Sequence, residues 1–593
     1  MSFYDAIRIG ASGAADFEVE RSLRFNSADD AYLSRTPSSA GNRKTWTWSG
    51  WLKFCSTSTG NCVFSGGSSC FNDRTAIFFP SGIINTDLCG IGAYEISEGH
   101  FKDFNAWYHF VWAFDTTQAT ASNRSKIYVN GSEISVTRPR NWSQNTDYGI
   151  NNNTLTTMGT FSNSINSYSF DGYMAEINFI DGQQLTPSSF GETNSDTGQW
   201  VPIDTSGLTF GSNGFRLQFK DNSSTTTLGK DTSGNGNDFT LHNFSVSAGV
   251  GNDSFTDTPT LNFPTLNALS PGSSTNGTLS NGNLEVTKAD YIMHRANFIF
   301  GPGGIQSGKW YWEVTNVNSN SSYYANYTGI TGDLTQDGGE VYLQGNKSIL
   351  GSHNHKTYTA TTVTDRSNEG TNKTMQFLLD VDNQQLIAKY DGSTIYTDTS
   401  IPDASTTNYV PFVMTTNSGT GGSTWSDSHF NFGQKDFVYS VPNGYNLINS
   451  ANLAEPTILL PNKHFDTLLY TGNGGTQSIT GLEFQPDWVW AKNRSGAQSN
   501  VLYDAVRGAT KEILSNSTNS ESTESTGLTS FDSNGFTAGS NGGINGTSGG
   551  GNYVAWNWNA GNTDGKTYTV TVVSDSGNKY RFDGFGTSAV TLD

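Results

Sequence analysis

The most regular pattern in the chain is an alternation of bulky and polar positions near its middle. Trp310, Trp312 and Val314 fall on one face of a stretch with a period of two. Tyr311 and Glu313 fall on the other face. A period of two is typical of a β-strand with one packed face. Because two tryptophans on one face bury a large area, we expect this strand inside a sandwich rather than at an edge.

The same alternation recurs along most of the chain, whereas the period of an amphipathic helix is nearly absent. Strands are predicted at residues 45–54, 107–114, 126–131, 172–181, 377–381, 386–390, 409–414, 429–434, 484–492 and 553–558. Single helical turns are expected at residues 185–190, with Pro187 in the first position, and at residues 511–514. A chain of 593 residues is too long for one core. The pattern therefore predicts an all-β chain of several domains in series.

Composition agrees with short strands joined by turns. The chain contains 66 glycines, and only 15% of its residues are charged, against an average near ~25%. The net charge of −20 argues against nucleic-acid binding, because a phosphate-binding surface needs clustered Lys and Arg. There is also no basic patch for an anionic membrane and no apolar run long enough to cross one.

Five motifs in the second half of the chain resemble the SPRY-type domain, a β-sandwich of the concanavalin-like kind. They are GKWYWEV, FLLDVDNQQLIAKYDG, YVPFVM, HFNFGQ and VPNGY, and they follow one another in this order. The resemblance covers residues 279–447. It implies a sandwich whose ligand is held by loops and not by catalytic residues.

A second set of motifs, in the first half, resembles a laminin-G-like (LamG) concanavalin sandwich. The motifs are RFNSADDAYLSR, WTWSGWLKF, WYHFVWAFD, KIYVNGSEI and FDGYMAEINFIDGQQLTPSSFGE, and we place the domain at residues 21–250. Residues 21–52 also resemble tail-fibre and appendage proteins of marine phages that infect cyanobacteria. Together the two resemblances imply a fold of serial β-sandwiches of the concanavalin-like jelly-roll kind.

The remaining segments are shorter. Residues 464–562 carry QPDWVWAKNRSG, LYDAVRG and YVAWNWNAG, which resemble a small β domain of phage structural proteins. Residues 563–593 read as the start of a further β domain, which either pairs with a neighbour or, the reading we favour, is cut short. Residues 251–278, which contain three prolines, and residues 448–463 are predicted to be linkers. Residues 1–20 are predicted to be an attachment arm, with a disordered terminus as the alternative.

The four cysteines, Cys55, Cys62, Cys70 and Cys89, lie in one stretch and allow three pairings. We rank disulfides first, free thiols second and a metal third, because the spacing of zinc knuckles is missing. Synthesis in a host cytoplasm would weaken the case for disulfides.

Calcium is the one cofactor considered. LamG relatives often hold an ion near their rim, and this resemblance draws attention to a Gly-rich turn with four oxygen-bearing side chains. These side chains are Asp231, Asn235, Asn237 and Asp238. The same residues also suit an ordinary hairpin connector, so both readings stay open.

Catalysis is not predicted. The Glu-x-Asp-x-Glu pattern of laminarinase-type glycosidases is absent, and so are the G-x-S-x-G and H-E-x-x-H motifs. Asp380 and Asp382 form the nearest pair of acids, but they fall at a strand end beside a turn, where Asp is common.

Carbohydrate binding would need an aromatic platform with hydrogen-bonding groups nearby. Candidate aromatic residues are Tyr323, Tyr324 and Tyr327, in a predicted loop after the central strand, and Trp425 in another loop. The alternative is that they pack against one another or against a neighbouring subunit.

The combination of an extracellular style of composition with no export signal at the start fits a virion component made in host cytoplasm. We therefore predict a non-enzymatic tail fibre or receptor-binding appendage of a phage. The partners expected are other virion proteins through the arm and a host glycan or protein, and the resemblance implies a homotrimer. A capsid decoration protein and a polysaccharide depolymerase are the alternatives.

Overall fold

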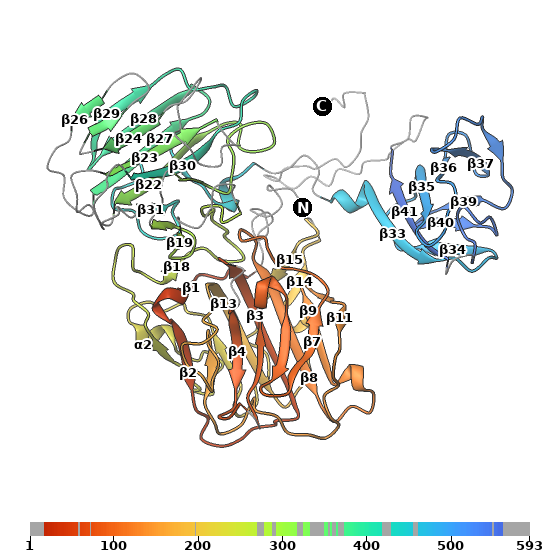
Figure 1. Cartoon of the computed structure of the whole chain (residues 1–593), viewed down its shortest axis with the longest axis horizontal. Helices are drawn as coiled ribbons and strands as arrows, with labels where there is room; N and C mark the ends of the chain where they lie inside the picture. Colours follow the sequence, from red (N-terminus) through yellow and green to blue (C-terminus); the bar gives the residue numbers. More distant parts are fainter. Residues whose placement is uncertain are drawn as a thin grey trace, which may run out of the picture. The chain divides into compact units, whose positions relative to one another are not determined.

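The computed structural model describes most of the chain and divides into two compact units, Met1–Glu455 and Pro456–Asp593 (Figure 1). The described residues are 17–56, 60–70, 73–195, 197–269, 278–287, 292–316, 324–332, 349–353, 356–358, 363–365, 373–417, 428–454, 460–547 and 551–560. Within them the fold is built of β-strands, and the helices are single turns such as α2 (Thr225–Leu228). The predicted all-β class is confirmed.

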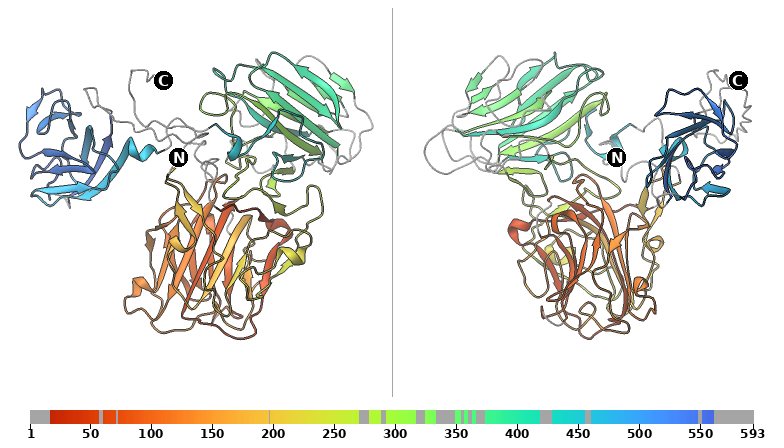
Figure 2. Two further views of the ribbon diagram at one scale, coloured as in Figure 1. Left: turned by 180° about the vertical axis from the view of Figure 1, so that it is seen from behind. Right: turned by 45° about the vertical axis from the view of Figure 1, so that its right-hand side comes forward.

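The first sandwich of unit 1 consists of two antiparallel sheets. In order, the first sheet contains β10 (Ser132–Glu133), β9 (Ser125–Val129), β8 (Tyr108–Asp115), β3 (Thr45–Phe54), β13 (Gly172–Asp181), β1 (Ser22–Phe25) and β18 (Ser254–Phe255), with β16 (Phe215–Leu217) beside β13. The second sheet contains β11 (Val136–Thr137), β7 (Gly92–Ser97), β6 (Asn85–Leu88), β5 (Thr75–Phe78), β4 (Cys62–Gly66), β12 (Thr156–Met158), β2 (Tyr32–Arg35) and β17 (Thr240–His242). A separate short hairpin pairs β14 (Gly191–Thr193) with β15 (Trp200–Pro202). Figure 2 shows the same strands from two further directions.

The strand β3 is buried on both of its faces. Trp46 and Trp48 pack in the core between the two sheets, as a strand with one apolar face requires. On the opposite face, Trp51 belongs to a second core cluster that also contains Trp312 of the second sandwich. The outer face of this sheet is therefore covered by other parts of the same unit.

The second sandwich contains the strand from which the sequence analysis began. One sheet runs β19 (Thr278–Ser280), β20 (Glu285–Thr287), β31 (Ser428–Asn431), β22 (Lys309–Asn316), β27 (Lys373–Asp380), β28 (Gln385–Tyr390) and β29 (Ser393–Asp398), with β32 (Asn446–Leu447) parallel to β22. The other runs β21 (Ile292–Arg295), β30 (Val410–Asn417), β23 (Tyr324–Thr331), β24 (Ile349–His353), β25 (Lys356–Tyr358) and β26 (Val363–Asp365). The strand β22 lies between β31 and β27, so its predicted position inside a sandwich is confirmed.

Both faces of β22 are occupied. Trp312 is fully buried and stacks on Phe377 with ring centroids 5.2 Å apart. On the other face, the carboxylate of Glu313 accepts a hydrogen bond from the Tyr311 hydroxyl at 2.7 Å. It also accepts the backbone N–H groups of Val438 and Tyr439 at 2.8 and 2.9 Å. These bonds fasten the segment after β31 over the outer face of the sheet.

The segment 251–269, predicted to be part of a linker, is packed into unit 1. Asp257 forms an ion pair with Lys53 of β3 at 2.7 Å, and neither side chain is exposed. The Lys53 ammonium also donates to the side-chain oxygen of Asn262 and to the Phe263 carbonyl, each at 2.8 Å. The backbone N–H of Asn262 in turn donates to the Ser450 hydroxyl, which follows the second sandwich. The two sandwiches are thus joined through a buried polar network.

Unit 2 is a smaller sandwich of two antiparallel sheets. The larger sheet runs β33 (Phe465–Thr471), β41 (Asn552–Trp558), β35 (Trp488–Asn493), β36 (Val501–Asp504), β37 (Lys511–Leu514) and β38 (Ser522–Thr523). The smaller runs β34 (Gln477–Thr480), β40 (Gly535–Ala538) and β39 (Leu528–Asp532). Their shared core contains Val489, Ala491 and Ala555 from the larger sheet.

The two expected helical turns have different outcomes. The first is present as a 3-10 turn at Pro187–Ser189, with Pro187 at its first position. The second prediction was wrong, because residues 511–514 form the strand β37, paired with β36. In β37 the carboxylate of Glu512 is buried and accepts a hydrogen bond from the Tyr503 hydroxyl. Pairing with β36 determines the conformation of residues 511–514. A segment of four residues is too short to show a clear period of two in the sequence.

Candidate functional site

The four residues predicted to bind calcium lie together in one turn between α2 and β17. The two carboxylate oxygens of Asp231 accept hydrogen bonds from the backbone N–H groups of Arg216, Ser233 and Asn237 at 2.8–2.9 Å. The carboxylate of Asp238 accepts the backbone N–H of Asp231 at 3.0 Å and pairs with Lys230 at 2.5 Å. The acids of this turn are thus bonded to the turn itself.

The two amides of the same turn fasten it to a neighbouring loop. Asn235 donates to the carbonyls of Gly211 and Gly214, and Asn237 donates to those of Ser212 and Gly214, at 2.7–3.0 Å. This is the bonding of a structural connector. In the described part of the chain, no three or more His, Cys, Asp or Glu side chains are grouped so as to hold a metal ion. Calcium binding here stays a prediction.

The predicted aromatic platform falls largely outside the described residues. Tyr323 and Trp425 lie outside them, and of Tyr324 and Tyr327 only the backbone is described. That backbone corrects the prediction of a loop, because Tyr324 and Tyr327 belong to β23 and pair with Asn417 and Met414 of β30. The sequence around them mixes small, polar and aromatic residues without a clear alternation, so the strand left little signal.

The cysteines are divided between one disulfide and two thiols. Cys70 and Cys89 form a disulfide, with their Cα atoms 4.6 Å apart. The prediction of disulfides is wrong for Cys55 and Cys62, which are free and buried. They pack in different clusters, Cys55 with the core of the second sandwich and Cys62 with Phe161. Burial raises the pKa of both thiols, so neither is a reactive thiolate at neutral pH.

We expect the Cys70→Ser/Cys89→Ser double variant to lose about 2 to 3 kcal/mol of the free energy of unfolding of unit 1, because closing a loop of this length restricts the unfolded chain. The loss should appear in denaturant unfolding of the oxidised protein. The oxidised and the dithiothreitol-reduced wild type should differ by a similar amount. Equal stability of the reduced and oxidised wild type would contradict the prediction.

The acid pair Asp380 and Asp382 closes a turn. Asp380 pairs with Lys309 at 2.8 Å and accepts two hydrogen bonds from Asn383, while Asp382 accepts the backbone N–H of Gly308 at 3.1 Å. Burial alone would raise the pKa of Asp380, but these hydrogen bonds outweigh it and hold the pKa below its ordinary value. A carboxylate kept ionised in this way is poorly suited to act as a general acid.

A buried Ser–His pair in β3 and β8 also has a structural explanation. The Ser49 hydroxyl lies 2.9 Å from Nε2 of His109, and the Trp200 indole N–H lies 2.9 Å from Nδ1. An indole N–H can only donate, so Nδ1 accepts and the ring proton of neutral His109 sits on Nε2. The histidine therefore donates to Ser49 and cannot take its proton. Burial lowers the pKa of His109 to about 3, which keeps the ring neutral.

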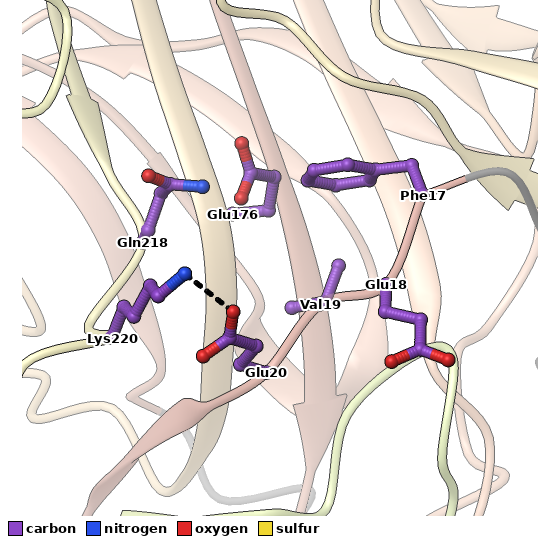
Figure 3. Close-up of a pocket in the computed structure, with 7 residues that line it drawn as sticks. All are labelled: Phe17, Glu18, Val19, Glu20, Glu176, Gln218 and Lys220. Atoms are coloured by element: carbon purple, nitrogen blue, oxygen red, sulfur yellow. Dashed lines mark ion pairs between the residues drawn. The ribbon is translucent and has the colours of Figure 1, made fainter.

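A pocket at the start of the described chain is too small for a sugar ring. Figure 3 shows the side chains that line it, with Phe17 and Glu176 facing each other and Lys220 paired with Glu20 at 2.5 Å. Its volume is about 70 Å³, well below the ~300 Å³ at which ligand pockets begin. The Glu176 carboxylate is held by Arg216 at 2.5 Å. Here the end of the predicted arm is anchored, since the Val19 N–H also donates to the Thr260 hydroxyl at 3.0 Å.

Unit 2 carries an aromatic surface that was not predicted from the sequence. On the larger sheet, tryptophans alternate with the core residues Val489, Ala491 and Ala555, so they point to the side opposite the core. We call this surface the tryptophan face; its members are Phe465, Leu469, Trp488, Trp490, Trp556 and Trp558. The signal was present as two W-x-W motifs, but a period of two does not say which face is covered.

The tryptophan face is ordered in rows across three strands. Trp488 and Trp558 are opposite each other and stack with ring centroids 4.5 Å apart, and Phe465 lies 4.8 Å from Trp558. Trp490 and Trp556 form the next row at 5.1 Å. All four tryptophans are partly exposed, while Phe465 is 40% and Leu469 66% exposed.

Comparison with known proteins gives one family match and several distant likenesses. Residues 460–592 match a family model described as a domain of unknown function (DUF7483). This match includes both the small β domain and the segment 563–592. A search of curated proteins found no match.

Three of the solved structures that resemble the chain do so at low similarity. The SAP-like pentraxin from Limulus polyphemus is 15% identical with a TM-score of 0.23, over 29% of this chain and 80% of the pentraxin. Domains LG4-5 of the mouse laminin alpha1 chain are 12% identical with a TM-score of 0.24, over 68% of this chain and 84% of theirs. The SPRY domain of human HERC1 is 14% identical with a TM-score of 0.18, over 26% of this chain and 91% of that domain. Such values do not bear on what this chain binds.

No helix in the described residues combines the length and the apolar character needed to cross a membrane.

Proposed function

We propose that this chain is a non-enzymatic structural protein of a phage virion, a tail fibre or another receptor-binding appendage that contacts host cell-surface glycans. The sandwiches present binding loops, residues 1–20 attach the chain to other virion proteins, and three copies assemble. The resemblances in residues 21–52 and 464–562 motivate the virion assignment.

The observation that carries the proposal is the buried network that joins the two sandwiches of unit 1. A receptor-binding appendage gains affinity when its binding loops are held in a fixed geometry before the ligand arrives. Lys53, Asp257 and Asn262 provide such a fixed junction, since all three are fully buried and bonded to one another or to the backbone. When one weak site on an appendage binds, the effective concentration of ligand at the other sites rises, so the overall affinity exceeds that of any single site.

The non-enzymatic assignment is supported by the bonding of three acids of unit 1. The carboxylates of Asp257, Glu176 and Asp380 each pair with a cation of the same chain, at 2.7, 2.5 and 2.8 Å. A retaining glycosidase instead needs two acids facing each other across a cleft. These three carboxylates therefore serve the fold.

The test is binding of the fluorescently labelled full chain to host cells and to their purified surface polysaccharide, with negative-stain imaging of virions labelled at the N-terminus. We expect saturable binding that free polysaccharide competes away, and label at the tail. Label over the shell without cell binding would favour a capsid decoration protein. New reducing ends released from the polysaccharide, and lost in Asp380→Asn, would overturn the non-enzymatic assignment.

A further inference from the structure

We propose that the tryptophan face of unit 2 is a docking surface for a neutral polysaccharide. The inference rests on the proposed function as a glycan-contacting protein and assigns that contact to a surface that the sequence analysis did not single out. It differs from the aromatic platform predicted from Tyr323, Tyr324, Tyr327 and Trp425, which lies in the region of residues 279–447.

Within the described fold, the tryptophan face has no structural task. The core of unit 2 is complete on the other side of the sheet, where Val489 and Ala555 pack with Phe536 of the smaller sheet. Outward positions of a half-covered antiparallel sheet are ordinarily polar. Four tryptophans at such positions leave apolar ring surface in water, which is unfavourable. A contiguous exposed apolar surface of this kind marks an interaction site.

Polar groups are interleaved with the rings of the tryptophan face. Each row across the paired strands contains a side chain that can form hydrogen bonds. Asp504 lies opposite Trp488 in the first row, and Thr467 lies opposite Trp556 in the second. A third row places Lys492 opposite Val554. Lys492 donates one N–H to the Gln498 carbonyl at 2.7 Å and so retains two further donors. Rings flanked by the Thr467 hydroxyl, the Lys492 ammonium and the Asp504–Arg507 ion pair match a ligand with apolar C–H faces and hydroxyl edges.

The net charge of the chain favours some classes of glycan over others. The chain carries a net charge of −20, and a field of this sign slows the approach of a polyanion. Lys492 is the one cation among the outward residues of β33, β35 and β41, and Asp504 at the end of the first row is already paired with Arg507 at 2.5 Å. A neutral polysaccharide fits this balance better than an acidic one.

The experiment uses the full chain with the neutral probes laminarin, dextran and xyloglucan and the polyanion alginate. Binding is followed by affinity electrophoresis and by the tryptophan fluorescence of the protein. We expect at least one neutral probe to bind more tightly than alginate. Trp488→Ala and Trp556→Ala should each weaken that binding about ten-fold or more, and Trp556→Tyr should retain most of it because a ring is kept.

The matched control is Val506→Ala, which removes an exposed apolar side chain of the same unit, 87% exposed, outside the tryptophan face. Its affinity should equal that of the wild type. Melting curves check that each variant folds, which is expected because the altered rings point away from the core. Analytical ultracentrifugation of each variant is run beside the binding assay.

The outcomes separate this inference from the proposed function. Wild-type binding that is unchanged in both alanine variants would overturn the docking surface and leave glycan binding to unit 1. Loss of self-association in Trp488→Ala with intact glycan binding would make the face an interface between copies and would also overturn it. Failure of the wild type to bind host polysaccharide or any probe would overturn the proposed function itself.

Discussion

Replacing Lys53 by methionine is expected to lower the free energy of unfolding of unit 1 by about 3 to 5 kcal/mol, the usual result of removing one partner of a buried ion pair. Methionine keeps much of the stem of the side chain but removes the ammonium. Asp257 would then keep a buried charge whose remaining partners are the indole N–H of Trp107 at 3.0 Å and the backbone N–H of Phe263 at 3.3 Å. Asn262 and the Phe263 carbonyl would lose the same donor.

Guanidinium unfolding of the full chain, followed by near-UV circular dichroism, measures this loss. The transition of unit 1 should move to lower denaturant, whereas that of unit 2 should not move. The double variant Lys53→Met/Asp257→Asn is the matched control, because it removes both charges; it should be more stable than Lys53→Met alone. A change below about 1 kcal/mol in Lys53→Met would show that the junction does not depend on this pair.

The same pair illustrates which part of the fold could be predicted from the sequence. Alternation identified β3, β8, β13 and β22 as strands, because each presents apolar residues with a period of two. It did not reveal that the outer face of β3 is covered, since Lys53 looks like an ordinary outward residue. Its partner Asp257 is 204 positions away, in a segment whose prolines resemble a linker. Local patterns carry no information about such a contact.

The candidate sites were harder to predict than the fold for a related reason. The turn at residues 231–238 was found because its ligand-type residues are neighbours in sequence, but their bonding to the backbone depends on loops such as Gly211–Gly214. Disulfides were ranked first for all four cysteines because they lie in one stretch, but the separate environments of Cys55 and Cys62 depend on which sheet each strand joins. The tryptophan face was missed because a period of two distinguishes the two faces of a strand but does not say which face the smaller sheet covers.

The second large effect is a loss of stability in acid caused by His109. Its pKa is about 3 in the folded protein because the ring is buried, whereas an unfolded histidine titrates near ~6.5. Between these values the unfolded chain binds a proton that the folded chain does not, so stability is present at neutral pH and falls as pH is lowered. From pH 7 to pH 4 the loss is about 3 kcal/mol, at 1.36 kcal/mol per pKa unit. The geometry gives the same sign, because a proton on Nδ1 would face the donor N–H of Trp200.

Urea unfolding of the wild type and of His109→Gln at pH 7, 5.5 and 4 tests this expectation. Glutamine does not titrate, so the variant should start less stable at pH 7 but lose about 3 kcal/mol less than the wild type on the way to pH 4. His294 is buried as well, with its pKa lowered to about 4; it remains in both proteins, and its contribution cancels in the comparison. Parallel pH profiles for the two proteins would mean that His109 is protonated in the folded state. In that case the Ser49–His109–Trp200 arrangement would have to hold an imidazolium, which the indole donor at 2.9 Å opposes.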